Sequence, residues 1–155
     1  MKNSLSIVIG SALALAICIG IARASEKPVR FADLPSAVKK TVQRESQGAT
    51  IKGYSKEVAH GRTAYEVEML LDGKSRDILI DPAGKVIEVE KQVPRDAVPA
   101  AAMAEIEKGA GRGSILKIEE VKSDSEIAYE AQVLINGKHR EVRVHADGST
   151  APEKD

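Results

Sequence analysis

Aromatic residues and cysteines are scarce in this chain of 155 residues. Aromatic side chains make up 3% of the sequence, tryptophan is absent, and Cys18 is the single cysteine. A hydrophobic core must therefore be built from Val, Ile, Leu, Ala and Met. A surface that stacks nucleic-acid bases is not expected, because it needs several exposed aromatic rings. Basic and acidic residues number 23 each, so the overall charge does not attract nucleic acid either.

The N-terminal segment has the composition of a secretory signal peptide. Lys2 gives it a positive start, and residues 5–22 carry no charge. Small residues at Ala22 and Ala24 predict a signal peptide over residues 1–24 that is cleaved after Ala24. The alternative is an uncleaved membrane anchor, because an apolar stretch of this length nearly spans a bilayer. The segment predicts a periplasmic or secreted protein.

Cleavage after Ala24 changes the chemistry of the chain. It removes Cys18, so the mature protein has no thiol for a disulfide or for a cysteine-ligated metal. It also removes Lys2 and Arg23, which leaves 21 basic and 23 acidic residues and a net charge of −2.

Two stretches of the chain are similar at a constant offset of 64 residues. Eleven identities relate residues 34–84 to residues 98–148, and they cluster around two Ala-Tyr-Glu tripeptides. Identities of this number at one offset predict an internal duplication. We therefore expect a first repeat over 30–93, a second repeat over 94–150, and a short disordered tail over 151–155.

Each repeat is predicted to begin with a helix. Asp33 is the expected N-cap of the first helix, Pro35 falls in its first turn, and Gly48 ends it. The apolar positions that follow helical spacing predict one buried face. In the first helix they are Leu34, Ala37, Val38, Thr41 and Val42, and in the second they are Val98, Ala101, Ala102 and Ile106.

Strands are predicted to follow each helix, first over 49–59 and over 113–123. The dipeptides Asp72-Gly73 and Asn136-Gly137 are strong signals for two-residue hairpin turns. Taken as turns, they set a register in which apolar residues face each other on one side of the sheet. The expected pairs are Tyr65 with Ile80, Val67 with Ile78, Tyr129 with Val144, and Ala131 with Val142.

The predicted fold class is α+β, with two tandem repeats. Each repeat is one helix packed on an antiparallel meander of three to four strands. A unit of about 60 residues without disulfides is marginally stable alone. The two repeats are therefore expected to pack together, either edge to edge into one sheet or face to face.

No catalytic motif is present, so the sequence predicts a protein that is not an enzyme and has no cofactor. The glycines at 109, 111 and 113 follow a helix, whereas a dinucleotide-binding fingerprint must follow a strand. His139 and His145 are expected on the outward face of one strand, ~20 Å apart, too far to ligate one metal. His60 is expected in a polar turn. No metal site is predicted from these residues.

Carboxylates are more numerous than histidines on the outward face. In the predicted register Glu68 faces Asp77, a like-charge pair that could hold a cation or a basic residue of a partner. The alternative is a hydrated surface pair, screened by Lys74 and Arg76. In the second hairpin Glu130 is predicted to face Arg143, which is an attractive pair.

The order of these elements resembles the PepSY-like family, and specifically its tandem, β-lactamase-inhibitor-like proteins of bacterial envelopes. The resemblance covers nearly all of 30–150. It rests on Tyr65-Glu66-Val67 through Asp72-Gly73-Lys74 and Gly84, and on Tyr129-Glu130 through Asn136-Gly137-Lys138 and Gly148. It implies a secreted or periplasmic role in binding or inhibition, and it supplies no catalytic residues.

The expected function is that of an exported, non-catalytic binding module, such as a peptidase inhibitor or a regulator of another envelope protein. The alternative is a periplasmic sensor or binding protein for a small ligand or cation. The expected partner is an envelope or secreted protein. Nucleic acid is not expected to bind, and the membrane is expected to be contacted only through an uncleaved signal segment.

Overall fold

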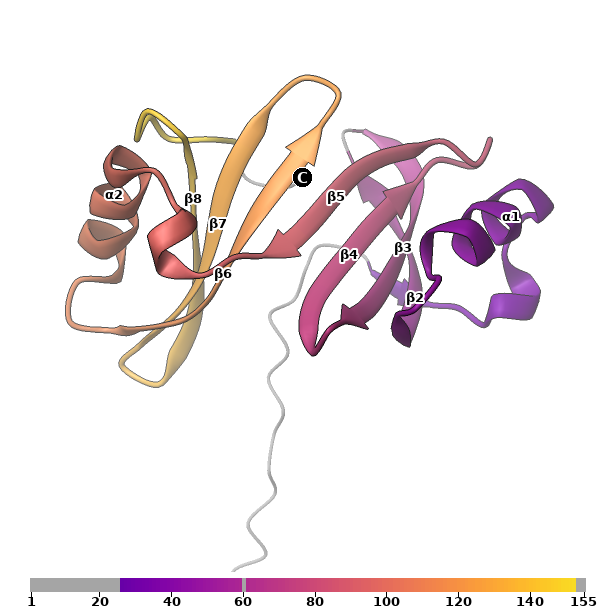
Figure 1. Ribbon diagram of the computed structural model, residues 1–155, viewed down its shortest axis with the longest axis horizontal. Coiled ribbons are helices and arrows are strands. Elements are labelled where there is room, and N and C mark those ends of the chain that lie inside the picture. The colour runs from indigo at the N-terminus through magenta and orange to yellow at the C-terminus, as the bar shows by residue number, and fades with distance from the viewer. Residues whose placement is uncertain (1–25, 60, 153–155) are drawn as a thin grey trace, which may run out of the picture.

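The computed structural model describes residues 26–59 and 61–152, which form one antiparallel sheet and two α-helices (Figure 1). The eight strands pair in chain order. They are β1 (Lys27–Pro28), β2 (Thr50–Ala59), β3 (Arg62–Leu71), β4 (Lys74–Ile80), β5 (Val86–Gln92), β6 (Ser114–Ser123), β7 (Ile127–Ile135) and β8 (Lys138–His145). The helices are α1 (Ser36–Glu45) and α2 (Ala100–Ala110), and each follows a short 3-10 turn, η1 (Phe31–Asp33) or η2 (Arg95–Ala97).

The predicted fold class of two tandem helix-on-meander repeats is wrong. All strands belong to one continuous, mostly β structure, in which β5 pairs with β6 through residues 88–92 and 119–123. This pairing satisfies the backbone groups at two strand edges that would otherwise be open. Local alternation could not predict it, because alternation gives the face of each residue but not the neighbour of each strand.

The two hairpin turns are confirmed. Asp72 and Gly73 both have positive φ angles, 53° and 77°, and Asn136 and Gly137 have 52° and 74°. Two successive positive φ values define the tight turn that matches the twist of paired strands. The four predicted apolar pairs are present in the ladders between β3 and β4 and between β7 and β8.

Both helices pack on the same side of the sheet, one over each half. The buried residues under α1 include Val38, Val42 and Ile78, and those under α2 include Ile106 and Val133. The predicted buried faces are correct except at three alanines. Ala37 is half-buried and Ala101 is exposed, although both were predicted to be buried. Ala110, at the end of α2, is buried and was not predicted to be.

The predicted N-cap of the first helix is wrong. Asp33 lies in η1, and its carboxylate accepts hydrogen bonds from the Arg30 guanidinium, with Nε to Oδ2 at 2.7 Å. Pro35 occupies the position before Ser36 instead, without a side-chain cap.

Two glycine turns bring the sheet against the helices. Gly84 has a φ of +89°, and a Cβ there would lie 2.9 Å from the Ala37 carbonyl oxygen. Gly148 is similar, with φ +84° and 2.9 Å to the Ala101 carbonyl oxygen. The Thr41 hydroxyl donates to the Gly84 carbonyl at 2.6 Å, which fixes α1 on this turn.

The C-terminal end is ordered further than predicted. Ala151, expected at the start of a disordered tail, is 2% exposed, and its N–H donates to the Arg143 carbonyl at 3.2 Å. Residues 153–155 and the predicted signal peptide with its cleavage at Ala24 lie outside the described residues. Neither described helix has the length and apolar character needed to cross a membrane.

Candidate functional site

The sheet face opposite the helices carries a row of buried carboxylates. Alternation along β2 to β7 places these side chains on one side, away from the apolar helix-covered side. Figure 1 shows the helices on the outer flanks, with the strands curving between them. The buried carboxylates of this face, called the carboxylate face below, are Glu57, Glu66, Asp77, Glu88, Glu90, Glu119 and Glu130, each at most 9% exposed.

The burial of Asp77 disagrees with one of the two predicted alternatives, a hydrated surface pair with Glu68. A polar residue at an alternate position is normally outward and hydrated, but a curved sheet brings neighbouring side chains of its inner face together. Glu residues at alternate positions of Val86–Gln92 are the sequence signal that places two carboxylates of β5 on the same face. Glu90 and Glu119 were not predicted as a group, because the pairing of β5 with β6 brings them together and no local pattern predicts that pairing.

One group of carboxylates lies at the junction of β4, β5 and β6. Oxygens of Asp77, Glu90 and Glu119 lie within 4.8 Å of one another. Lys117 Nζ is 2.8 Å from Glu119 Oε1, and the Ser75 hydroxyl donates to the same oxygen at 2.6 Å. We call Asp77, Glu90 and Glu119 the seam cluster.

The Asp77 carboxylate replaces a backbone acceptor in the β3–β4 ladder. The backbone pairs run from Tyr65 with Ile80 to Val67 with Ile78 and resume only at Leu70. In the gap the Met69 N–H donates to Asp77 Oδ1 at 3.1 Å. The side chain is therefore fixed by the strand that it faces.

The pKa of Asp77 is raised from 3.8 to about 7. Burial is the main cause, since it disfavours the charged form. The Met69 N–H acts in the opposite direction, and the neighbouring charges of Glu119, Glu90 and Glu66 raise the pKa further. Near neutral pH this carboxyl therefore exists in both protonation states.

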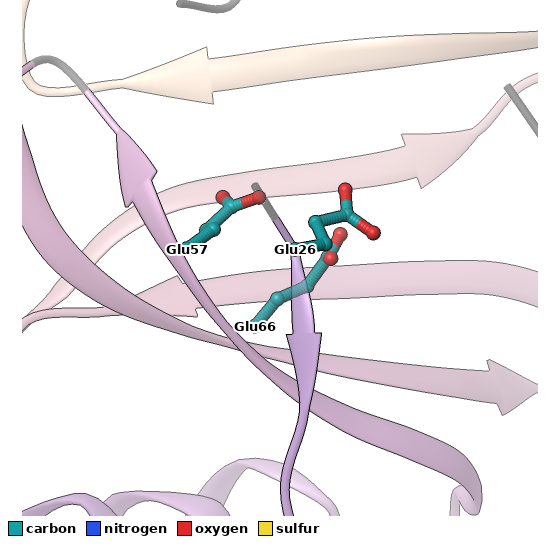
Figure 2. A group of neighbouring side chains, drawn as sticks. All are labelled: Glu26, Glu57 and Glu66. Atoms are coloured by element: carbon teal, nitrogen blue, oxygen red, sulfur yellow. The ribbon is translucent and has the colours of Figure 1, made fainter. Parts of the chain in front are cut away.

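A second group lies at the β1 edge of the sheet. Figure 2 shows Glu26, Glu57 and Glu66 close together, and one carboxylate oxygen of each lies within 4.8 Å of the others. The Ser55 hydroxyl donates to Glu66 Oε2 at 3.3 Å. Carboxylate oxygens are the ligands that Ca²⁺ and Mg²⁺ prefer, so these three residues could hold such a cation.

A third group is centred on Arg143 of β8, whose side chain is 5% exposed. Its guanidinium lies 3.4 Å from Glu130, 3.2 Å from Glu126 and 3.8 Å from Glu88. The predicted pairing of Glu130 with Arg143 is confirmed. Since Glu88 belongs to β5, this one cation links both halves of the sheet.

The pairs Val67 with Ile78 and Leu70 with Ser75 keep the predicted register, in which Glu68 faces Asp77, but the two carboxylates differ in burial. Glu68 is exposed, and its Oε2 lies 3.6 Å from the position that a Cβ would take at Gly53 of β2. Asp77 joins carboxylates of β5 and β6 instead.

The two described histidines do not meet at one site. His139 is exposed, and His145 is half-buried, with Nδ1 3.8 Å from Glu126. His60 lies outside the described residues.

The rim of the carboxylate face is open at the end where the hairpin turns lie. Glu68 and Glu141 are exposed there, and Gln92, Lys117 and Gln132 are half-buried. Both hairpin tips, at Gly73 and Gly137, are also exposed. Neither helix of the described residues covers this exposed, polar end of the face.

No protein-family model and no curated protein matches the chain. Solved structures do resemble it. A candidate periplasmic protein from Bacteroides eggerthii is 15% identical, with 77% of this chain and 86% of that chain covered and a TM-score of 0.57. A BLIP-like protein from Bacteroides fragilis is 18% identical, with 78% and 86% covered and a TM-score of 0.52. A DUF2874 family protein from Bacteroides uniformis is 13% identical, with 76% and 86% covered and a TM-score of 0.57.

These similarities establish a shared fold. The neighbours that share it include one described as BLIP-like and one described as periplasmic. The predicted likeness to β-lactamase-inhibitor-like proteins is supported at the level of fold. The PepSY assignment and the tandem repeat are not confirmed by these comparisons.

Proposed function

We propose that the protein is an exported, non-catalytic binding module that engages another envelope protein in the periplasm. The observation that carries this proposal is the open rim of the carboxylate face, since both helices lie on the other side of the sheet. The predicted export signal and the described periplasmic neighbour support the location.

The chemistry of the rim favours a partner with a basic surface. Glu68 and Glu141 project exposed carboxylates on either side of the half-buried Lys117. The buried carboxylates behind them add to the negative potential. Attraction between opposite charges increases the rate of association and weakens as salt is added. A basic loop of a peptidase or of a regulated envelope protein is the expected ligand.

Binding can be tested with the protein as bait against cross-linked envelope extract, followed by titration with each purified partner. Glu68→Lys and Glu141→Lys are expected to weaken binding together by roughly tenfold or more, because each exchanges attraction for repulsion. Gln43→Lys, on the exposed side of α1, is the matched control and is expected to bind normally. A purified partner whose affinity is unchanged by the two rim variants would contradict the proposal.

A peptidase-inhibitor role has a separate readout. A panel of envelope peptidases is titrated with the protein, and inhibition is expected for an enzyme that the bait retains. If the bait retains a peptidase whose activity does not fall, inhibition is excluded and a regulatory or scaffolding role is favoured.

The second candidate function is binding of a small ligand or cation. The group of Glu26, Glu57 and Glu66 favours it, because three carboxylates converge within 4.8 Å. Calorimetry with Ca²⁺ and Mg²⁺ decides: this function predicts heat of binding that Glu57→Gln removes and Glu141→Gln leaves unchanged. A flat titration of the unmodified protein excludes it.

A further inference from the structure

The sheet ends at β8, and one end of the outer edge of this strand is already paired. After β8 the chain turns back, and residues 149–151 lie antiparallel along residues 143–145. The Ala151 N–H donates to the Arg143 carbonyl at 3.2 Å, and the His145 N–H donates to the Ser149 carbonyl at 2.8 Å. This edge therefore accepts an added strand from the chain itself.

The rest of the edge presents backbone groups to its surroundings. Successive residues of a strand direct these groups to opposite sides, so the N–H and C=O of His139 and Glu141 point the same way as those of Arg143 and His145. Among the residues that the structure describes, none pairs with His139 or Glu141 on that side. Residues 138–142, called the open edge below, thus offer donors and acceptors to another extended segment.

The two faces of the open edge carry opposite charges. Glu141 lies opposite Gln132 on the carboxylate face, and Arg140 lies opposite Val133 on the helix side. Both charged side chains are exposed. An added strand would place one residue directly opposite each of them, where opposite charges stabilise the pairing and like charges destabilise it. The open edge therefore selects a segment with a basic residue facing Glu141 and an acidic residue facing Arg140.

A second copy of this chain does not have that charge pattern. Antiparallel pairing of two open edges can centre on His139, Arg140 or Glu141. Centred on His139, it places Lys138 opposite Arg140. The other two registers place Arg140 opposite Arg140, or Glu141 opposite Glu141. Each register has a like-charge pair, and such charges are a common protection of an open edge against self-association.

The last residues of the chain do not have the pattern either. The pairing of residues 149–151 with β8 sets a register in which position 153 faces position 141, and position 154 faces position 140. Glu153 would then oppose Glu141, and Lys154 would oppose Arg140. Both pairs are like-charged, so the open edge fits a foreign segment better than the chain's own.

We propose that the envelope partner binds by adding an extended segment to the open edge, antiparallel to β8, with a basic residue opposite Glu141 and an acidic residue opposite Arg140. Main-chain hydrogen bonds to His139 and Glu141 hold the segment, and the two charged side chains select it. This inference rests on the proposed function, because it names how the partner is held. Glu141 belongs both to the rim and to the open edge, so the two surfaces are continuous.

The test supplies such a segment within the chain. In the double variant Glu153→Lys with Lys154→Glu, the last residues gain the selected charge pattern while the net charge stays the same. Because the segment is tethered, its effective concentration is high. We expect the amides of His139 and Glu141 to exchange hydrogen about tenfold more slowly than in the unmodified protein, since two like-charge pairs become opposite-charge pairs.

The reciprocal variant is the matched control. Arg140→Glu with Glu141→Lys reverses the charges of the edge instead of the tail, so exchange at positions 139 and 141 should be slowed in the same way. All four substitutions together restore like charges and should abolish the slowing. The Ala151 amide, which is hydrogen-bonded to β8, shows whether each variant keeps the fold.

Three results would overturn the proposal. The first is equal exchange at positions 139 and 141 in all four proteins. The second is faster exchange there when residues 153–155 are removed from the unmodified protein, because the chain's own tail would then be the occupant. The third is slowing that increases with protein concentration, which would identify a second copy as the occupant.

A partner recovered from the envelope extract separates this inference from the proposed function. With the partner bound, the amides of His139 and Glu141 are expected to exchange at least about tenfold more slowly. A bound partner that leaves both amides unchanged contradicts strand addition but not binding. If no partner is retained, the proposed function fails together with the assigned occupant, whereas slowing in the charge-reversed variants would still show that the edge accepts a strand.

Discussion

At the scale of single residues, the buried carboxylates dominate the electrostatics of the molecule. Arg143 lies 3.4 Å from Glu130, and Lys117 lies 2.8 Å from Glu119. Burial raises the pKa of Asp77, whereas Arg143 places a positive charge beside Glu130 and Glu88. Two residue substitutions test these opposite cases.

Asp77→Asn is expected to stabilise the protein at high pH. The pKa of Asp77 is about 7 in the folded protein against 3.8 ordinarily, so the folded state holds the proton more tightly than the unfolded state. Unmodified protein therefore loses stability as the pH rises from about 4 to 7, and the loss is complete above 7. One pKa unit corresponds to about 1.4 kcal/mol, so the substitution should raise the free energy of unfolding by up to roughly 4 kcal/mol.

Urea unfolding between pH 4 and pH 8 measures this gain. The difference between the variant and the unmodified protein should grow with pH and level off above 7. Glu141→Gln is the control and should show no such growth. A pH-independent difference for Asp77→Asn would mean that the carboxyl is not destabilised in the folded state.

Arg143→Met is expected to destabilise the protein by roughly 3–5 kcal/mol at pH 7, because it removes the Arg143 charge from beside the buried Glu88 and Glu130. Arg140→Met, on the same strand but exposed, is the control and should change stability by less than about 0.5 kcal/mol. Urea unfolding of both variants at one pH is sufficient. Equal small effects would show that Arg143 is not coupled to these carboxylates.

At the scale of elements, the turns were the most predictable features. Asp-Gly and Asn-Gly dipeptides specify tight hairpins through their own backbone preferences, so the register of β3–β4 and β7–β8 followed from the sequence. The start of α1 did not follow, because η1 takes Asp33 out of the N-cap position. The two-residue β1 was also missed, since its edge pairing with β2 has no local pattern.

Gly84→Ala tests how closely the turn before β5 approaches α1. The new methyl group would lie 2.9 Å from the Ala37 carbonyl oxygen, and the φ of +89° disfavours a side chain. We expect the free energy of unfolding to fall by more than about 1 kcal/mol, because backbone strain and steric overlap add together.

Gly73→Ala is the matched control for this strain. Its φ of +77° is similar, but nothing lies within 4 Å of the new methyl group. Its free energy of unfolding should therefore fall by about 1 kcal/mol from backbone strain alone. Thermal unfolding compares the two, and equal losses would show that the Ala37 contact is not tight.

At the scale of the whole molecule, the sequence predicted the parts better than their assembly. Hydrophobic alternation identified the strands and the faces of both helices that pack on them. It could not show that β5 pairs with β6, because either an open edge or a paired edge is compatible with the same alternation. It also left open whether Glu68 and Asp77 form a cation site or a hydrated surface pair, since the burial of Asp77 depends on residues far away in the chain.

The account rests on carboxylates gathered and buried where the two halves of the sheet meet. The most direct test is a pH titration of the Asp77 side-chain carboxyl carbon by NMR in the intact protein. The account predicts a midpoint near pH 7, as burial and the neighbouring Glu90 and Glu119 require. A midpoint near the ordinary value of 3.8 would contradict it, because it would show that Asp77 is hydrated and apart from the other carboxylates.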